Sequence, residues 1–188
     1  MIGYDQMWQH MINRTIPNKH TWLLDSRGDI DITYGSKIFD GRKILYLGIP
    51  GCFEPVSNQQ LKDYNNFKSD IQSLGVDKII FGCDESPWIL DAWMKHHNIN
   101  GGIGWYNDGL GQLASDCEMY VDRSHLGLGQ RIWRHFIILE DSIIKYFDAE
   151  DGISHFGADR NPYEKCKPHN VVEIIEKVRD GGLQLNHE

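Results

Sequence analysis

The chain has 188 residues, of which 40% are hydrophobic, 11% aromatic and 24% charged. This length and composition predict a single globular domain over residues 1–188 with a substantial core, and they exclude a disordered chain. The net charge of −8 argues against nucleic acid or an anionic membrane as the main partner, because both require a basic surface.

The cysteines predict reduced thiols. Cys52, Cys83, Cys117 and Cys166 are widely spaced and include no C-x-x-C pair, so neither a disulfide framework nor a zinc site is expected, and no other cofactor is indicated. The first residues lack the basic and apolar regions of a signal peptide. No apolar run approaches the ~18 residues that a membrane span needs. We therefore expect a cytoplasmic protein.

The first half of the chain predicts a hairpin followed by a strand–helix–strand unit. Two short strands are expected within residues 21–34, around a turn at Arg27 to Asp29. Apolar runs predict buried strands at Lys43–Ile49 and Val76–Cys83. Between them, apolar residues at three- and four-residue steps predict a helix over Ser57–Leu74, with Ser57 as N-cap in an S-x-x-Q capping box.

The second half adds further alternating elements. It predicts a helix at Ser86–His97, a strand at Gly101–Asp108, a short helix at Leu110–Met119, a hairpin at Arg134–Glu150, a closing helix at Asn170–Val178 and a loose tail at 180–188. Alternating strands and helices with a late hairpin indicate an α/β fold, in which helices flank a central mixed β-sheet.

The residues with chemical potential gather in PGCFEPVSN, from Pro50 to Asn58. Ser57 would lie at a helix N-terminus, but a serine hydroxyl needs a general base and no G-x-S-x-G elbow surrounds it. From the residues alone, Ser57 is expected to cap the helix, Glu54 to be a solvated loop carboxylate and Cys52 to be an inert thiol.

Two arginines lie close together in a later segment. Arg131 and Arg134, in GLGQRIWRHF, could clamp an anion or lie on the surface. The residues alone leave both alternatives open.

Several motifs, taken in order, resemble the type II, peroxiredoxin 5-like group of peroxiredoxins. PGCFEPVSN resembles that family's P-G-A-F-T-P-T-C-S site, and CDESPWILDAWMK resembles its N-D-x-F-V-M-x-A-W segment. WYNDGLGQLAS resembles its A-D-G-x-G-x-F segment, and GLGQRIWRHF resembles the start of its G-x-R-S-W-R-Y hairpin. The resemblance extends over roughly residues 20–178.

The resemblance implies a thioredoxin-like fold and reduction of hydrogen peroxide or alkyl hydroperoxides by a cysteine thiolate. It also implies a homodimer and electrons supplied by glutaredoxin or thioredoxin. Carried over to this chain, Pro50 matches the proline that shields the thiolate, and Arg134 matches the arginine that lowers the thiol pKa. Arg131 matches a second, supporting arginine.

The chain departs from the family pattern at the centre of the site. Ser57 stands at the peroxidatic cysteine position, Glu54 at the threonine position and Cys52 at an alanine position, while Cys166 falls near the resolving cysteine of some members. Serine forms neither a thiolate nor a sulfenic acid. The sequence therefore predicts a chain that is inactive as a thiol peroxidase through position 57.

Two explanations for Ser57 stay open. The serine could be an engineered Cys→Ser change in an active peroxidase, or a natural loss in a binding or scaffold protein. Glu54 favours natural loss, because a carboxylate would repel a thiolate and compete with peroxide for Arg134. We therefore expect Glu54 to pair with Arg134 and close the site. A third alternative, Cys52 as replacement nucleophile, is disfavoured because Cys52 would lack the helix N-terminus.

Overall fold

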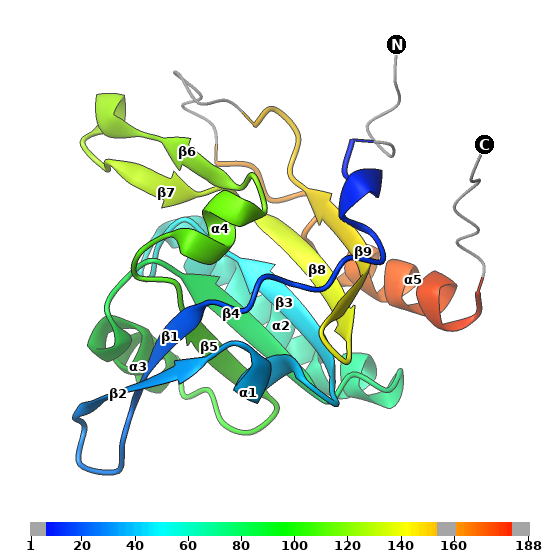
Figure 1. Cartoon of the computed structure of the whole chain (residues 1–188), viewed down its shortest axis with the longest axis horizontal. Coiled ribbons are helices and arrows are strands. Elements are labelled where there is room, and N and C mark those ends of the chain that lie inside the picture. The colour runs from blue at the N-terminus through cyan, green and yellow to red at the C-terminus, as the bar shows by residue number, and fades with distance from the viewer. Residues whose placement is uncertain (1–6, 154–160, 182–188) are drawn as a thin grey trace.

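The structure, a computed structural model, describes residues 7–153 and 161–181 (Figure 1). Its centre is a five-stranded sheet in the order β5-β4-β3-β8-β9. The strands are β3 (Lys43–Gly48), β4 (Lys78–Cys83), β5 (Ile103–Asn107), β8 (His135–Glu140) and β9 (Ile143–Ala149). Strands β3, β4 and β5 are parallel, whereas β8 is antiparallel to β3 and β9 is antiparallel to β8. The predicted mixed sheet is confirmed.

Strand β3 is central because both of its faces are apolar. Leu45 and Leu47 pack into one core cluster, and Ile44 and Tyr46 pack into a second cluster on the other face of the sheet. A strand buried on both faces reads as a nearly continuous apolar run, which is why the sequence predicted it.

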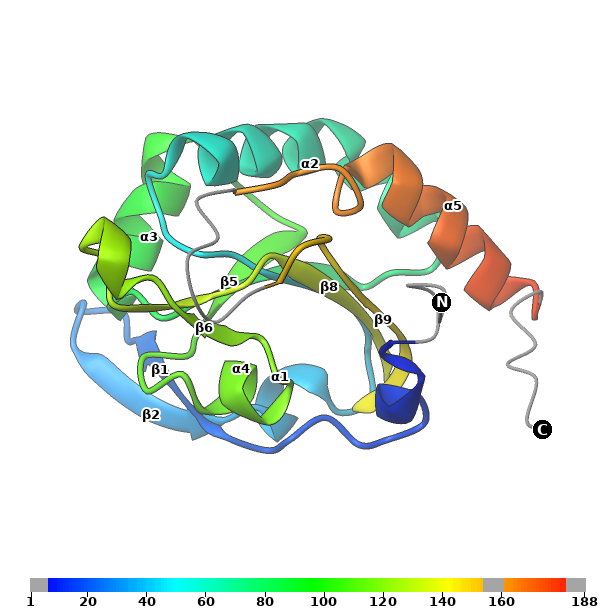
Figure 2. The ribbon, with the colours of Figure 1, turned by 90° about the horizontal axis from the view of Figure 1, so that it is seen from above.

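Three long helices cover one face of the sheet, as Figure 2 shows from above. They are α2 (Pro55–Ser73), α3 (Pro87–His96) and α5 (Pro168–Arg179). Leu61, Tyr64 and Ile71 of α2 are fully buried against the sheet, which confirms the predicted apolar stripe. The parallel β3–α2–β4 unit is also confirmed. Helix α2 begins two residues earlier than predicted, at Pro55.

The other face is covered by shorter elements (Figure 2). The predicted N-terminal hairpin consists of β1 (His20–Leu24) and β2 (Ile30–Tyr34), and the predicted short helix is α4 (Gln112–Asp116). Two elements on this side were not predicted: α1 (Ser36–Phe39) and the 3-10 turn η2 (Gln9–Met11). Both are a single turn long, so they show no apolar periodicity.

The segment before β8 contains a small antiparallel ribbon that the sequence did not predict. It is formed by β6 (Tyr120–Asp122) and β7 (Gln130–Ile132), with η3 (Ser124–Leu126) between them. The predicted hairpin of β8 and β9 follows it. Asp141 and Ser142 at its turn have φ values of 49° and 63°, as a two-residue hairpin turn requires. Arg134 directly precedes β8.

The last helix, α5, ends at Arg179. Of the tail predicted to be loose, residues 182–188 lie outside the described residues. Among the residues that the structure describes, no helix combines the length and the apolar character needed to cross a membrane.

Candidate functional site

The site is centred on Arg134, which is 1% exposed. Its backbone carbonyl accepts a hydrogen bond of 3.0 Å from Glu150 N, and its guanidinium lies 5.7 Å from the centre of the Tyr163 ring. Arg134 is therefore part of the protein interior, which excludes the surface alternative for this arginine.

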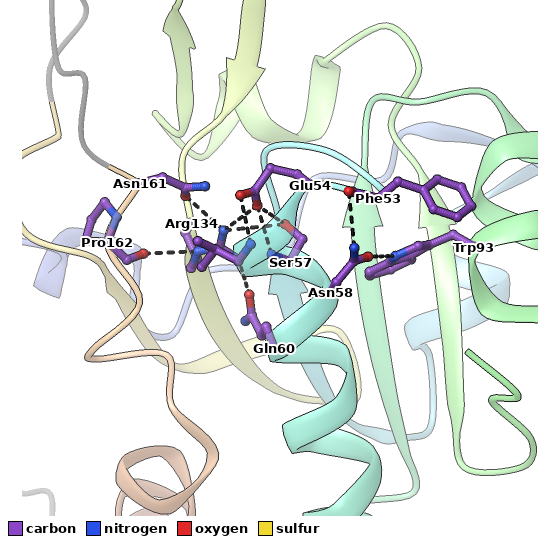
Figure 3. A network of polar contacts seen from close by, with 10 residues as sticks. Phe53, Glu54, Ser57, Asn58, Gln60, Trp93, Arg134, Asn161 and Pro162 are labelled. Atoms are coloured by element: carbon purple, nitrogen blue, oxygen red, sulfur yellow. Dashed lines mark hydrogen bonds and ion pairs between the residues drawn. The ribbon is translucent and has the colours of Figure 1, made fainter. Parts of the chain in front are cut away.

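Arg134 joins the start of α2 to the segment that precedes α5 (Figure 3). Nη2 donates to Asn161 Oδ1 at 2.9 Å, to Glu54 Oε2 at 3.3 Å and to Ser57 Oγ at 3.4 Å. Nε donates to the carbonyl of Pro162 at 3.1 Å, and Nη1 donates to Gln60 Oε1. A buried guanidinium needs such a set of acceptors, because it cannot lose its proton in a protein.

Glu54 is the N-cap of α2. Its backbone is extended, with φ −68° and ψ 137°, and Pro55 follows as the first helical residue. The carboxylate accepts hydrogen bonds from Val56 N at 2.9 Å and Ser57 N at 2.8 Å. A carboxylate here satisfies free N–H groups and interacts favourably with the helix dipole.

Two predictions from the residues alone are therefore wrong. Ser57 is the third residue of α2 and not its cap, so the capping box with Gln60 does not form. Glu54 is not a solvated loop residue, since its side chain is only 28% exposed. The physical reason is the sequence Glu54-Pro55. Proline favours the first position of a helix, so α2 begins at Pro55, and the carboxylate of Glu54 then caps the helix N-terminus.

The environment of Glu54 keeps its carboxylate ionised. Partial burial is the largest single effect on the pKa of Glu54 and by itself would raise it, whereas the hydrogen bonds from the N–H groups of Val56 and Ser57 lower it. The Ser57 hydroxyl and the Arg134 charge lower the pKa further, so that it lies below its ordinary value. At neutral pH the site thus holds a negative charge beside Arg134, as the sequence predicted. The two charged groups are in contact at 3.3 Å.

Ser57 is fully buried. Its hydroxyl donates to Glu54 Oε2 at 2.9 Å and accepts from Arg134 Nη2. Glu54 is the nearest base, but a carboxylate with a lowered pKa is a weak one. The geometry therefore does not activate Ser57 as a nucleophile.

Arg131 and Pro50 lie in other surroundings. Arg131 Nη1 donates to Asp84 Oδ2 at 3.4 Å, and the Tyr120 hydroxyl donates to the same oxygen at 3.3 Å. No contact between Arg131 and Arg134 is seen among the described residues. Pro50 lies after the end of β3, separated from Gly48 by Ile49, and is half-buried.

The two cysteines that the sequence singled out, Cys52 and Cys166, differ in their burial. Cys52 is half-buried in the turn after β3. Cys166 is fully buried, and burial raises the pKa of its thiol well above the usual value, although the nearby Arg134 charge acts in the opposite direction.

Three residues of the site were not recognised from the sequence. Gln60 was assigned to a capping box, and Asn161 and Pro162 lie in a segment that carried no signal. A second polar contact near the site was also missed. Asn58 Oδ1 accepts from Trp93 Nε1 at 2.7 Å, and Asn58 Nδ2 donates to the carbonyl of Phe53 at 3.2 Å (Figure 3).

An open groove of about 710 Å³ lies on the outer side of the site. Residues from the start of α2 and from the segment before α5 line it: Pro55, Val56, Gln59, Asn161, Pro162, Tyr163, Glu164 and Lys167. Neither Ser57 nor Arg134 is in this lining. Within residues 7–153 and 161–181, no group of three or more His, Cys, Asp or Glu side chains could hold a metal ion.

Comparison with known sequences gives a consistent result. The sequence pattern of the family described as Redoxin matches residues 17–165. Peroxiredoxin y4vD of Sinorhizobium fredii is 25% identical over 160 residues, which cover 85% of this chain and 80% of that protein. Peroxiredoxin-2C of Oryza sativa subsp. japonica is 28% identical over 143 residues, which cover 75% of this chain and 88% of that protein.

Solved structures are similar over most of the chain. One described as an X-ray structure of a peroxiredoxin superposes with a TM-score of 0.81 at 26% identity, over 88% of this chain and 98% of that chain. Peroxiredoxin 5 from Alvinella pompejana superposes with a TM-score of 0.74 over 88% of this chain and 97% of that chain. At 17% identity the second match is a likeness of fold alone. Together they confirm the predicted thioredoxin-like fold.

Proposed function

The match over residues 17–165 makes this chain a member of the redoxin family. We propose that it keeps the fold and the frame of a peroxiredoxin site, meaning the arrangement of its elements, but has lost the peroxidase reaction. In this proposal the chain does not reduce peroxides through position 57 and acts as a non-catalytic binding or scaffold protein. The peroxiredoxin relatives and the peroxiredoxin-like fold support the frame, and the residues at positions 54 and 57 support the loss of activity.

The observation that carries the proposal is the position of the Glu54 carboxylate. Its Oε2 lies 3.3 Å from Arg134 Nη2 and 2.9 Å from Ser57 Oγ. A peroxide bound at this arginine would need the hydrogen bonds that Glu54 already accepts. A thiolate at position 57 would stand beside a second negative charge, which disfavours its ionised form. Glu54 thus opposes both substrate and nucleophile.

A second candidate function is supported by Arg134 itself. Its Nη2 lies 3.4 Å from Ser57 Oγ, a place from which a cation would lower the pKa of a thiol at that position. An engineered Cys→Ser change in an active thiol peroxidase would leave such an arginine in place. That native protein would take electrons from thioredoxin or glutaredoxin, with Cys166 as a candidate resolving thiol.

The experiment that separates the two candidates is peroxide consumption with dithiothreitol as reductant. Four proteins are compared: the chain itself, Ser57→Cys, Ser57→Cys with Glu54→Thr, and Ser57→Cys with the control Glu164→Thr. Glu164 suits as a control because its side chain is 77% exposed and pairs only with Lys167 among the described residues. We expect no consumption above background by the chain. The double variant Ser57→Cys with Glu54→Thr should be at least tenfold faster than Ser57→Cys alone and than Ser57→Cys with Glu164→Thr. The reason is that lowering the thiol pKa by one unit raises the fraction of thiolate about tenfold.

Two outcomes would contradict the proposal. If Ser57→Cys alone were as fast as the variant that also lacks Glu54, the carboxylate would not close the site, and the engineered enzyme would be the better account. If the chain itself consumed peroxide at a peroxidase rate, another cysteine would carry the chemistry.

A homodimer is the second part of the proposal. Strands β3, β4 and β5 are parallel, so the loops that follow them lie at one edge of the sheet. Phe53, Trp88, Ile89 and Leu110 follow these strands and are 38–63% exposed. Sedimentation should show a dimer that Leu110→Glu weakens and that Met7→Glu leaves intact, because Met7 is exposed and adjoins η2, which packs on β9 at the opposite edge of the sheet. A monomeric chain would contradict this part.

The four thiols suit the reducing cytoplasm that the proposal assigns to the protein.

A further inference from the structure

The hairpin of β1 and β2 lies at the periphery of the molecule in both views (Figure 1, Figure 2). Its inner face is polar. Thr21 is fully buried, and its Oγ1 accepts a hydrogen bond of 3.1 Å from Asn107 N at the end of β5. Thr33 is opposite Thr21, and Asp31 lies on the same face because side chains alternate along a strand. The outer face carries three apolar side chains that are 42–59% exposed: Ile30, Ile32 and Tyr34.

This distribution is the reverse of the usual one for a hairpin on a protein surface, in which apolar side chains face the core and polar ones face solvent. Cross-strand neighbours on β1 extend the outer apolar face: Trp22 and Leu24. The outer face of the hairpin is therefore a continuous apolar strip, and a strip of this kind is typical of an interaction surface.

The backbone of β2 has a free outer edge. Among the strands that the structure describes, only β1 pairs with β2. Gly35 N donates to the carbonyl of Lys19 at 2.9 Å, one residue beyond the end of β2. Bonded and non-bonded pairs alternate along an antiparallel ladder, so every second residue before Gly35 also bonds to β1. The N–H and C=O groups of the intervening residues point outward and form a template for another strand. These residues are Ile30, Ile32 and Tyr34.

We propose that this hairpin is a self-association surface, at which β2 pairs with β2 of a second copy of the chain to form an antiparallel, four-stranded sheet. When a two-fold axis relates two identical strands, one residue lies opposite itself at the axis. With Ile32 at the axis, all five residues of β2 are paired, and Ile30 faces Tyr34 of the second copy. The outward backbone groups are then all used, and the two apolar strips join into one.

The charge of Asp31 selects this register. With Ile32 at the axis, Asp31 faces the neutral Thr33 of the second copy. A shift that places Asp31 at the axis brings two carboxylates face to face, which is destabilising. A shift that places Thr33 at the axis leaves Ile30 without a partner on β2 of the second copy. Only the register centred on Ile32 pairs the whole strand without a clash of like charges.

The charges that flank β2 favour a second copy of the chain as the occupant. In the register centred on Ile32, the exposed Asp29 lies opposite Gly35 of the second copy. The exposed Lys37 follows two residues later, within reach of a long side chain along the diagonal of a strand pair. The two-fold axis repeats this approach of opposite charges on the other side of the contact.

The hairpin contact goes beyond the proposed function, because it uses neither position 57 nor the apolar residues around Leu110. Five residues from each copy form a small contact, so the association is weak. It adds to the dimer proposed above only at high protein concentration. The two proposals can therefore fail separately.

The test is the cross-linking of single cysteines on β2 by a short bismaleimide, in a background in which Cys52 is replaced by serine. In the proposed pairing, the two Cα atoms of residue 32 are about 5.5 Å apart. Those of residue 30 are about 14 Å apart, because four residues separate them along the strand. Ile32→Cys should therefore be linked into a dimer about tenfold faster or more than the matched control Ile30→Cys, since a linker that cannot span two sites gives almost no effective concentration. An equimolar mixture of Ile30→Cys and Tyr34→Cys should give the mixed dimer.

Equal rates for Ile32→Cys and Ile30→Cys would indicate random collisions and would overturn the proposal. Linkage of neither variant would overturn it as well, and would leave the apolar strip to a different partner.

A second measurement needs no added cysteine. Sedimentation equilibrium at rising protein concentration is carried out on Leu110→Glu, which weakens the other proposed interface. This variant should still dimerise through the hairpin. Ile32→Lys should weaken that dimer about tenfold, because two like charges then face each other at the axis. The control Met7→Lys changes an exposed residue near η2 and should have no effect. A Leu110→Glu variant that stayed monomeric at every concentration, or equal effects of Ile32→Lys and Met7→Lys, would contradict the proposal.

Discussion

The carboxylate of Glu54 lies 3.3 Å from the guanidinium of Arg134, across a sequence separation of 80 residues. The first residue caps α2 and the second precedes β8. The pair therefore links the start of a helix on one face of the sheet to β8, which is antiparallel to the central strand β3. In the proposal above, this pair engages the arginine that a peroxide and a thiolate at position 57 would need.

Glu54→Gln should destabilise the fold, because it leaves the buried charge of Arg134 without its carboxylate. The glutamine keeps one oxygen for the cap, so we expect a loss of about 1–3 kcal/mol in the free energy of unfolding, below the full cost of breaking a buried pair. Denaturant unfolding at pH 7 measures it. The matched control is Glu164→Gln, whose exposed side chain pairs with Lys167 and should change stability by less than about 0.5 kcal/mol. Equal effects of the two substitutions would contradict the structural role of Glu54.

Arg134→Met, combined with Glu54→Gln in a double-mutant cycle, should reveal their coupling. Each single change leaves the other group unpaired, whereas the double change removes both charges. We expect the double variant to be more stable than the sum of the single losses predicts, by about 1–3 kcal/mol. The same unfolding measurement applies to all four proteins. Strict additivity would mean that the contact at 3.3 Å contributes nothing.

Asn58→Ala should cost about 1–3 kcal/mol, because it leaves the indole N–H of Trp93 without its acceptor in a fully buried position. Asn58 also holds the carbonyl of Phe53 in the turn before Glu54, so the local structure around the cap should loosen. Thermal unfolding with tryptophan fluorescence measures the first effect, and amide exchange of Val56 and Ser57 measures the second. Asn66→Ala is the control, because Asn66 is an exposed residue of the same helix whose side chain forms no hydrogen bond with the described part of the chain. A fall in stability no larger than that of Asn66→Ala would contradict the role of Asn58.

Stability should decrease as the pH falls, and His135 should account for part of the decrease. Burial lowers the pKa of His135 to about 4 from 6.5, against the opposing effect of its hydrogen bond to the Trp133 carbonyl. The unfolded chain therefore takes up the proton first, and the contribution to stability is full above pH 6.5 and lost as the pH falls toward 4.

His135→Phe removes this titration and keeps an aromatic ring against Phe147, on which His135 stacks. Between pH 7 and pH 4.5, the unaltered chain should lose about 2 kcal/mol more stability than His135→Phe does. Urea unfolding at the two pH values gives the difference. Parallel losses in both proteins would show that His135 does not titrate as its burial requires.

Most of the fold could be predicted from the sequence, because its signals are local. Strands β3 and β4 are continuous apolar runs, and the stripe of Leu61, Tyr64 and Ile71 has helical spacing. The ribbon of β6 and β7 was missed because three-residue strands have too few positions to show an alternating pattern.

The site could be predicted only in part. The contact of Glu54 with Arg134 followed from charge and from the resemblance. The contacts of Arg134 with Gln60, Asn161 and Pro162 span 27 to 74 residues, and nothing in their local sequence indicates them. The cap of α2 was misassigned because S-x-x-Q and Glu54-Pro55 are competing local signals. The structure shows that the proline decides the first helical position.

The most direct measurement of the central claim is the pKa of a thiol placed at position 57. It is obtained from the pH dependence of iodoacetamide alkylation, in Ser57→Cys and in Ser57→Cys with Glu54→Gln, both in a background in which Cys52 is replaced by serine. If Glu54 closes the site, removal of its charge should lower the thiol pKa by about one unit or more, since Arg134 then faces the thiolate alone. An unchanged pKa would contradict the claim that the Glu54 carboxylate opposes a thiolate at position 57.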